Sequence, residues 1–215
     1  MSLWIFIALA AATFQTVRFM LQKVLSSARL TPVGATFARF AYSAPLLVAG
    51  LAAYFWVTGG PVPDTTAAFW IYAVTGGATQ IIATICVVAL FQQRNFAVGI
   101  AFMKTEVILT ALIGLVVLGD RVSPAGLGAI LIGLVAVLIL SKTPGAEGRW
   151  WRHLTGRAPV LGIASGVLFA VSSVTYRGAT LEFGSVDPVL RATLTLACVA
   201  TMQMLAMGLW LAVRD

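Results

Sequence analysis

The sequence contains little charge. Only 10% of its 215 residues are Asp, Glu, Lys or Arg, 60% are hydrophobic, and the mean hydropathy is +0.98. Soluble domains carry about 25% charged residues, so this composition excludes the water-soluble class and indicates a polytopic membrane protein. The net charge of +7 comes from cations scattered through connections and helix ends, without the basic stripe of a nucleic-acid-binding surface. We therefore expect membrane lipids, and no nucleic acid, among the partners.

Histidine and cysteine are also scarce. His153, the one histidine, lies in a polar connection, so no histidine at membrane depth can serve as a base for nucleophilic catalysis. The segment GIASG at 162–166 has the wrong spacing for a Gly-x-Ser-x-Gly nucleophile motif. Cys86 and Cys198 lie within apolar runs, where a small buried thiol is the ordinary interpretation, and no dense Asp, Glu and His cluster suits a metal. We expect no enzyme activity, no cofactor and no metal.

Long apolar runs dominate the chain. A span needs about 20 mostly apolar residues, and this criterion predicts an all-α polytopic membrane protein, a helical bundle of about seven transmembrane helices. The expected spans are 3–25, 33–57, 68–92, 96–118, 124–141, 159–181 and 189–213. Several of them start at or near a proline, which costs no hydrogen bond in the first helical turn.

The charges of the connections predict an orientation. Basic residues gather in the odd-numbered connections, above all in 142–158, and at the C-terminal end, whereas four acids lie in the even-numbered connections (Asp64, Asp120, Glu182 and Asp187). The positive-inside rule then places the odd connections in the cytoplasm and the N-terminus outside.

The fourth span, 96–118, holds Lys104 and Glu106 well inside its apolar run. A charge at that depth costs about 2.5–3.5 kcal/mol on insertion scales. Arg18 and Arg39 lie inside the first two spans and are expected in the same leaflet as Lys104. One interpretation is a cation-lined cavity for carboxylate or phosphate groups, with Glu106 as proton carrier or resting counter-ion. The other is a structural network in which Glu106 pairs with Lys104 or Arg39.

Positions 104 and 106 lie about 200° apart on a helix, so each of these charges needs a partner on another helix or water. Polar residues of neighbouring spans are expected to line the same path as the charges. The candidates for substrate binding or ion coupling are therefore Lys104, Glu106, Arg39, Arg18, Gln15, Gln80, Thr84 and Thr105. Catalytic, cofactor-binding and metal-binding residues are not expected.

A weak internal repeat relates the two ends of the chain. Ala8, Ala12 and Thr16 align with three small residues of the sixth span (Gly162, Gly166 and Ala170), and such residues at four-residue spacing allow close helix packing in lipid. Two residues later in phase, Thr31-Pro32-Val33 aligns with Asp187-Pro188-Val189. Five spans precede the second copy, so it is inserted upside down, as in the inverted repeats of secondary transporters.

Two stretches resemble a known family. The run GDRVSPAGLGAILIGLVAVLIL (119–140) resembles the end of an EamA-type repeat of the drug/metabolite transporter superfamily, with Asp120 in place of the family's glutamate. The stretch TPVGATFARFAYSAPLL (31–47) resembles the second helix of that repeat and its Arg-Phe pair, here Arg39-Phe40. The second copy, at 160–213, lacks this pair.

The resemblance implies ten helices in two inverted five-helix repeats, a cytoplasmic N-terminus that opposes the charge-based orientation, and export or exchange of small metabolites. The predicted domains are a first EamA-like repeat (1–142), an inter-repeat loop (143–158) and an incomplete second repeat of two helices (159–215). Three helices would be missing, so we expect either a fragment, or a shortened homologue completed by a second copy or a partner protein. A seven-span protein complete in itself is the competing interpretation.

The leading functional prediction is a secondary transporter of a small organic metabolite or amino acid in the bacterial inner membrane. It would work by alternating access, with an anionic or zwitterionic substrate and proton coupling through Glu106. The alternative is a truncated, non-transporting interaction subunit. An intramembrane enzyme is the least favoured option.

Overall fold

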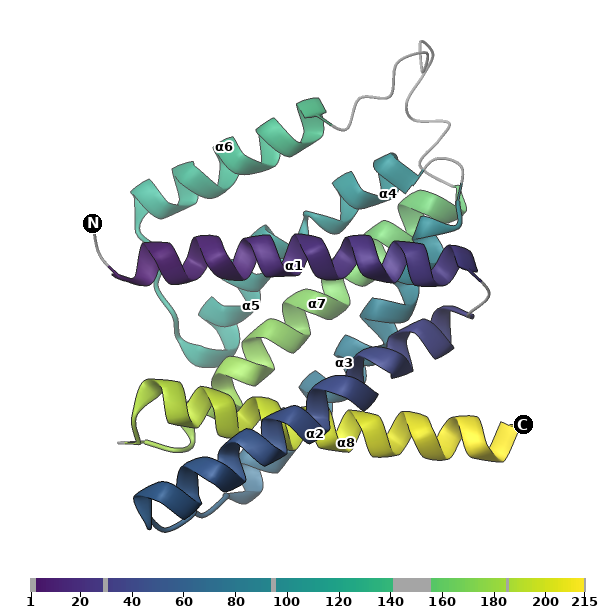
Figure 1. The fold of residues 1–215 in the computed structure, drawn as a ribbon. Helices are drawn as coiled ribbons and strands as arrows, with labels where there is room; N and C mark the ends of the chain where they lie inside the picture. Colours follow the sequence, from purple (N-terminus) through teal and green to yellow (C-terminus); the bar gives the residue numbers. More distant parts are fainter. Residues whose placement is uncertain (1–2, 29–30, 94–95, 141–155, 185, 215) are drawn as a thin grey trace.

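The structure of the chain is a computed structural model that describes residues 3–28, 31–93, 96–140, 156–184 and 186–214. Throughout these ranges the regular structure is α-helical, and the predicted all-α class is confirmed (Figure 1). The helices are α1 (Leu3–Ala28), α2 (Pro32–Thr58), α3 (Ala67–Phe91), α4 (Phe96–Met103), α5 (Glu106–Leu118), α6 (Pro124–Leu140), α7 (Arg157–Leu181) and α8 (Pro188–Arg214). His153 and most of the loop predicted at 143–158 lie outside the described residues.

Five of these helices, α1, α2, α3, α7 and α8, are long and apolar enough to cross a membrane. They match five of the predicted spans to within a few residues. The fourth predicted span differs, because 96–118 forms two helices, α4 and α5, which are interrupted at Lys104 and Thr105. Helix propensity does not predict this interruption, since neither proline nor glycine occurs between Ile100 and Ile113.

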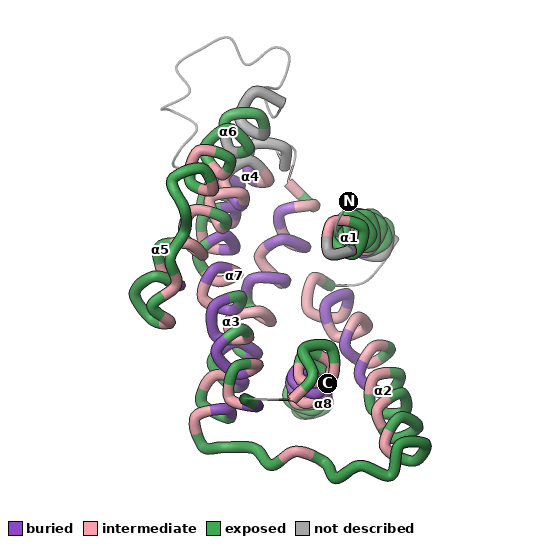
Figure 2. The backbone as a smooth tube through the Cα atoms, turned by 90° about the vertical axis from the view of Figure 1, so that its left-hand side faces the viewer, coloured by how far each residue is buried: buried purple, intermediate pink, exposed green. Residues whose placement is uncertain are grey.

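Helix α7 lies at the centre of the packing. It contacts α3, α4 and α5, while α8 packs against α2 and α3. Figure 2 shows α4, α5 and α6 to one side of α7, and α1, α2 and α8 to the other. Helices α1 and α6 are peripheral, and most of their described side chains are exposed.

Small residues permit the closest helix contacts. Gly162 of α7 lies directly against the backbone of Gly99 in α4, with the Gly99 Cα only 2.9 Å from the place a Cβ would take. One turn further along α7, Gly166 lies against Met103 and Thr105, at the α4–α5 interruption, with the Thr105 hydroxyl 2.9 Å from the place a Cβ would take. The spacing of small residues in the sequence predicted this kind of packing. These contacts hold the interrupted helix firmly against α7.

Candidate functional site

A hydrogen-bonded polar cluster joins α3, α7 and α8. The Tyr176 hydroxyl donates to Gln80 Oε1 at 2.9 Å. Gln203 Nε2 lies within hydrogen-bond distance of Gln80 Oε1 (3.0 Å), the Gly77 carbonyl oxygen (3.0 Å) and the Tyr176 hydroxyl (3.2 Å). Gln203 is only 2% exposed, whereas Gln80 and Tyr176 are half-buried. We call Gln80, Tyr176 and Gln203 the polar cluster.

The polar cluster has more acceptors than Gln203 can fully satisfy. Its amide nitrogen carries two hydrogens, but three oxygens surround it. At least one of these oxygens must share a hydrogen or accept from another donor. The Tyr176 hydroxyl is that donor, since it gives its hydrogen to Gln80 Oε1. Only the remaining lone pairs of these oxygens can accept a hydrogen from a bound molecule.

Arg39 of α2 continues this polar region. Its Nη1 donates to Thr84 Oγ1 at 3.5 Å, a long contact, and Thr84 in turn donates to the Gln80 carbonyl oxygen one helical turn earlier at 2.8 Å. Arg39 also lies within electrostatic range of Tyr176 and of Arg18 in α1. The structure thus brings together four of the predicted residues, Arg18, Arg39, Gln80 and Thr84, around a single polar region.

Lys104 and Glu106 lie elsewhere, at the interruption between α4 and α5. Lys104 directly follows Met103, the last residue of α4, and Glu106 is the first residue of α5. Each charge thus stands at the helix end whose partial charge it complements. Lys104 is the charged group that acts on Glu106, and no ion pair joins either residue to another described side chain. Gly166, which packs against the interruption, is ten residues from Tyr176, about 15 Å along α7 at 1.5 Å per residue.

The other two predicted residues lie apart from the polar cluster. Thr105 donates its hydroxyl to the Phe102 carbonyl oxygen at 2.8 Å and packs against Gly166, so its polar atom serves the local backbone. Gln15 is exposed on α1. In this structure neither residue adds to the polar cluster.

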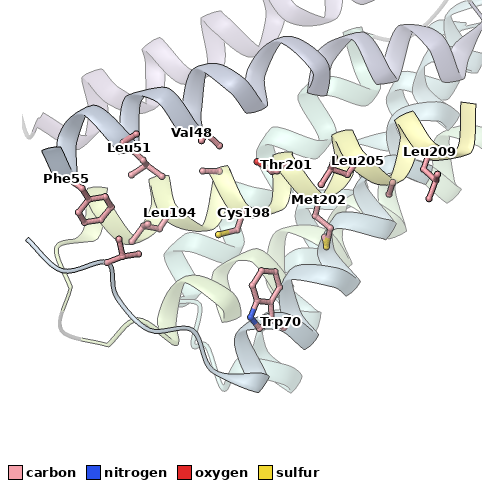
Figure 3. A pocket seen from close by; sticks show the side chains of 14 residues that line it. Val48, Leu51, Phe55, Trp70, Leu194, Cys198, Thr201, Met202, Leu205 and Leu209 are labelled. Carbon is pink, nitrogen blue, oxygen red and sulfur yellow. The ribbon is translucent and has the colours of Figure 1, made fainter. Parts of the chain in front are cut away.

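An apolar cavity of about 770 Å³ lies between α2 and α8, next to Trp70 of α3. Figure 3 shows Leu51 and Phe55 of α2 on one side of it and a row of α8 side chains, from Leu194 to Leu209, on the other. Thr201 supplies the lone hydroxyl of its lining. Met202 also lines the cavity and contacts Gly77, so α8 separates this apolar space from the polar cluster.

The turn between α5 and α6 is built by the GDRVS segment. Gly119 adopts a left-handed conformation with φ of 69° and ends α5, which glycine permits without a side-chain clash. Asp120 forms an ion pair with Arg177 of α7 at 2.8 Å. Ser123 accepts a hydrogen bond from the Gly126 backbone at 3.1 Å and so caps α6. Each of these residues has a structural task in the turn.

Comparison with known proteins gives one match. The model of the EamA-like transporter family matches residues 2–142, well over half of the chain. The chain belongs to the EamA-like transporter family. No curated protein and no solved structure was found to match it. As an EamA-like protein with long apolar helices, it is an integral membrane protein of a transporter family.

The EamA-like match includes α1 to α6 and therefore supplies only part of the polar region. Gln80, Thr84, Arg18 and Arg39 lie within the matched residues, whereas Tyr176 and Gln203 come from α7 and α8, beyond it.

Tyr176 and Gln203 were not among the residues predicted from the sequence. A signal existed, since Gln203 is a polar residue in the middle of an apolar span. An uncharged amide or phenol is less costly in lipid than a charge, however, and the sequence alone does not show which helix it faces.

Proposed function

We propose that the chain is a secondary transporter that exports or exchanges a small organic metabolite or amino acid across the bacterial inner membrane by alternating access. The substrate's polar groups are held by Gln80, Tyr176 and Gln203. This goes beyond family membership, which indicates a transporter without naming its substrate or mechanism.

The position of the polar cluster is the main support. Gln80 belongs to α3, in the family-matched part of the chain, while Tyr176 and Gln203 belong to the two helices that follow it. Binding sites of transporters with inverted repeats lie near the midplane between the repeats. Gln80 and Gln203 also lie near the middles of their helices, which suits a site at that depth.

A purely structural role for the polar cluster predicts different results. Hydrogen bonds between membrane helices contribute about 0.6 kcal/mol on average, so these residues could serve only to hold α3, α7 and α8 together. A change at the cluster would then alter stability in detergent but leave the affinity for substrate unchanged in the folded fraction. A binding role predicts loss of affinity even in variants that fold well.

The test starts from the purified protein. A thermal-shift screen of amino acids, organic acids and nucleosides identifies binders, because a ligand of the folded state raises the melting temperature. Counterflow of a radiolabelled hit into proteoliposomes then measures transport. Tyr176→Phe removes one hydroxyl and should lower the affinity at least about fivefold, since a polar group left unpaired costs about 1–3 kcal/mol.

The matched control is Gln92→Leu, at an exposed position at the end of α3, which should bind and transport as the unaltered protein does. Equal affinities for Tyr176→Phe and Gln92→Leu would reject the polar cluster as the binding site. A folded chain that transports no hit alone, but does so once a partner protein is added, would instead favour the interaction subunit.

A further inference from the structure

Two arginines inside the membrane-spanning helices lie within electrostatic range of each other, and no acid of the described residues forms an ion pair with either. Arg39 of α2 interacts electrostatically with Arg18 of α1, and Glu106 is not among the charges that act on it. Two like charges repel each other, more strongly in a medium of low dielectric than in water. An anionic group beside Arg18 and Arg39 would relieve this repulsion.

The described acids have other surroundings. Asp120 is paired with Arg177, and Glu182 accepts a hydrogen bond from Thr66 at 2.7 Å. Asp187 accepts from the backbone at the start of α8, and Asp64 is exposed in the connection before α3. Glu106 stands beside Lys104. Within the described ranges, no carboxylate of the chain balances the two arginines.

Unpartnered polar atoms occur at the same place. Arg18 Nε and both amide atoms of Gln22 are buried and make no hydrogen bond to the described residues. Gln22 is only 5% exposed and lies one turn after Arg18, on the same face of α1. Between them, Phe19 packs edge-on against Phe91 of α3 with ring centroids 6.2 Å apart, which turns this face of α1 toward α3.

The chemistry of these three atoms indicates what they can bind. Arg18 Nε and Gln22 Nε2 are donors and suit an anionic oxygen, while Gln22 Oε1 is an acceptor. Arginine binds carboxylate and phosphate groups through a planar set of donors. A ligand that carries an anionic group and a hydroxyl or ammonium donor would satisfy all three atoms. A carboxylate would offset one of the two arginine charges, and a phosphate, with about −1.5 to −2, would offset nearly both.

We propose that α1, α2 and α3 form an anion-binding site in which Arg18, Gln22 and Arg39 hold a carboxylate or phosphate group of a ligand that also carries a hydrogen-bond donor. The site rests on the proposed function, because Thr84 links Arg39 to Gln80 of the polar cluster and the anion would be the charged end of the transported molecule. The same chemistry is offered by the headgroup of an anionic lipid.

The experiment separates these two sources. The full chain is placed in nanodiscs of phosphatidylcholine, and its melting temperature is measured with increasing glycerol 3-phosphate, with glycerol as the neutral control. A second set of nanodiscs contains phosphatidylglycerol. A rise with glycerol 3-phosphate but not with glycerol supports a soluble anion as ligand, whereas a rise with phosphatidylglycerol alone supports the lipid. No rise in either set overturns the proposal.

Variants test whether Arg18, Arg39 and Gln22 cause the rise in melting temperature. Arg18→Gln and Arg39→Gln should each raise the half-maximal glycerol 3-phosphate concentration at least about tenfold, since a hydrogen bond to a charged group is worth about 1.5–3 kcal/mol. Gln22→Leu removes buried unpartnered atoms, so it should fold well and still respond less to the anion. Arg214→Gln, at the exposed end of α8, is the matched control. Equal responses in all four variants would also overturn the proposal.

These experiments can reject the anion site and the transporter proposal independently of each other. A chain that responds to the anion but transports nothing in proteoliposomes keeps the anion site and loses the transporter proposal. A chain that transports a neutral substrate but does not respond to the anion keeps the transporter proposal and loses the anion site.

Discussion

Gly162 offers the sharpest test of the packing around α7. An alanine there would place its Cβ against the carbonyl oxygen of Gly99 and 2.9 Å from the Gly99 Cα and carbonyl carbon. All three atoms belong to the backbone, so no side-chain rotation can relieve the contact. Carbon atoms pack at about 3.5–4.0 Å, and α4 and α7 must therefore separate by about 1 Å where they cross.

The expected change in the unfolding free energy of Gly162→Ala follows from two opposing effects. Alanine is favoured over glycine within a helix by about 1 kcal/mol, whereas overpacking costs about 1–3 kcal/mol. Gly50 of α2 has nothing within 4 Å of its Cβ position, so Gly50→Ala should experience only the first effect. We expect Gly162→Ala to unfold about 1–3 kcal/mol more easily than Gly50→Ala.

The assay is SDS-induced unfolding in mixed micelles, followed by tryptophan fluorescence. The Gly162→Ala variant should also be more sensitive to protease at Met103–Glu106, because the neighbouring contact of Gly166 would loosen as the helices separate. Indistinguishable unfolding curves for Gly162→Ala and Gly50→Ala would refute the close α4–α7 approach.

Three further changes test separate features. Glu106→Gln should lower the unfolding free energy by about 0.3–1 kcal/mol, because it removes a charge that complements the start of α5, yet abolish proton-coupled transport. Normal pH-dependent uptake in vesicles would exclude Glu106 from the mechanism. Gln203→Leu should lower the unfolding free energy by about 1–2 kcal/mol through lost interhelical hydrogen bonds, and an unchanged SDS midpoint would contradict the polar cluster. Asp120→Asn should cost less than about 1 kcal/mol, because its partner Arg177 is 60% exposed and water screens the pair; a loss above 2 kcal/mol would show a larger role.

The helices could be predicted from the sequence because their signal is local. Runs of apolar residues that start at Pro32, Pro124 and Pro188 gave the starts of α2, α6 and α8 to within a residue. The interruption at Lys104 and Thr105 could not be predicted in this way. The interruption packs against Gly166 of α7, which is more than sixty residues away in the sequence.

Only part of the candidate site could be predicted, because the sequence shows which residues are charged but not which helices meet. Charge at membrane depth is visible in a sequence, and it directed attention to Arg18, Arg39, Lys104 and Glu106. The structure groups the two arginines but keeps Glu106 with Lys104 at the interruption. Which polar groups meet depends on how the helices cross, and the contacts of Tyr176 and Gln203 with Gln80 arise only once α7 and α8 have packed.

The central place of α7 has a consequence for synthesis. Helices α3, α4 and α5 all pack against α7, yet α7 ends about forty residues after the family-matched region. At about 5–20 residues per second, the ribosome needs about 2–8 s to make that stretch. During this interval Gly99, Met103 and Thr105 lack the helix they pack against. The nascent chain must therefore be kept from misassociation or proteolysis while it waits for α7.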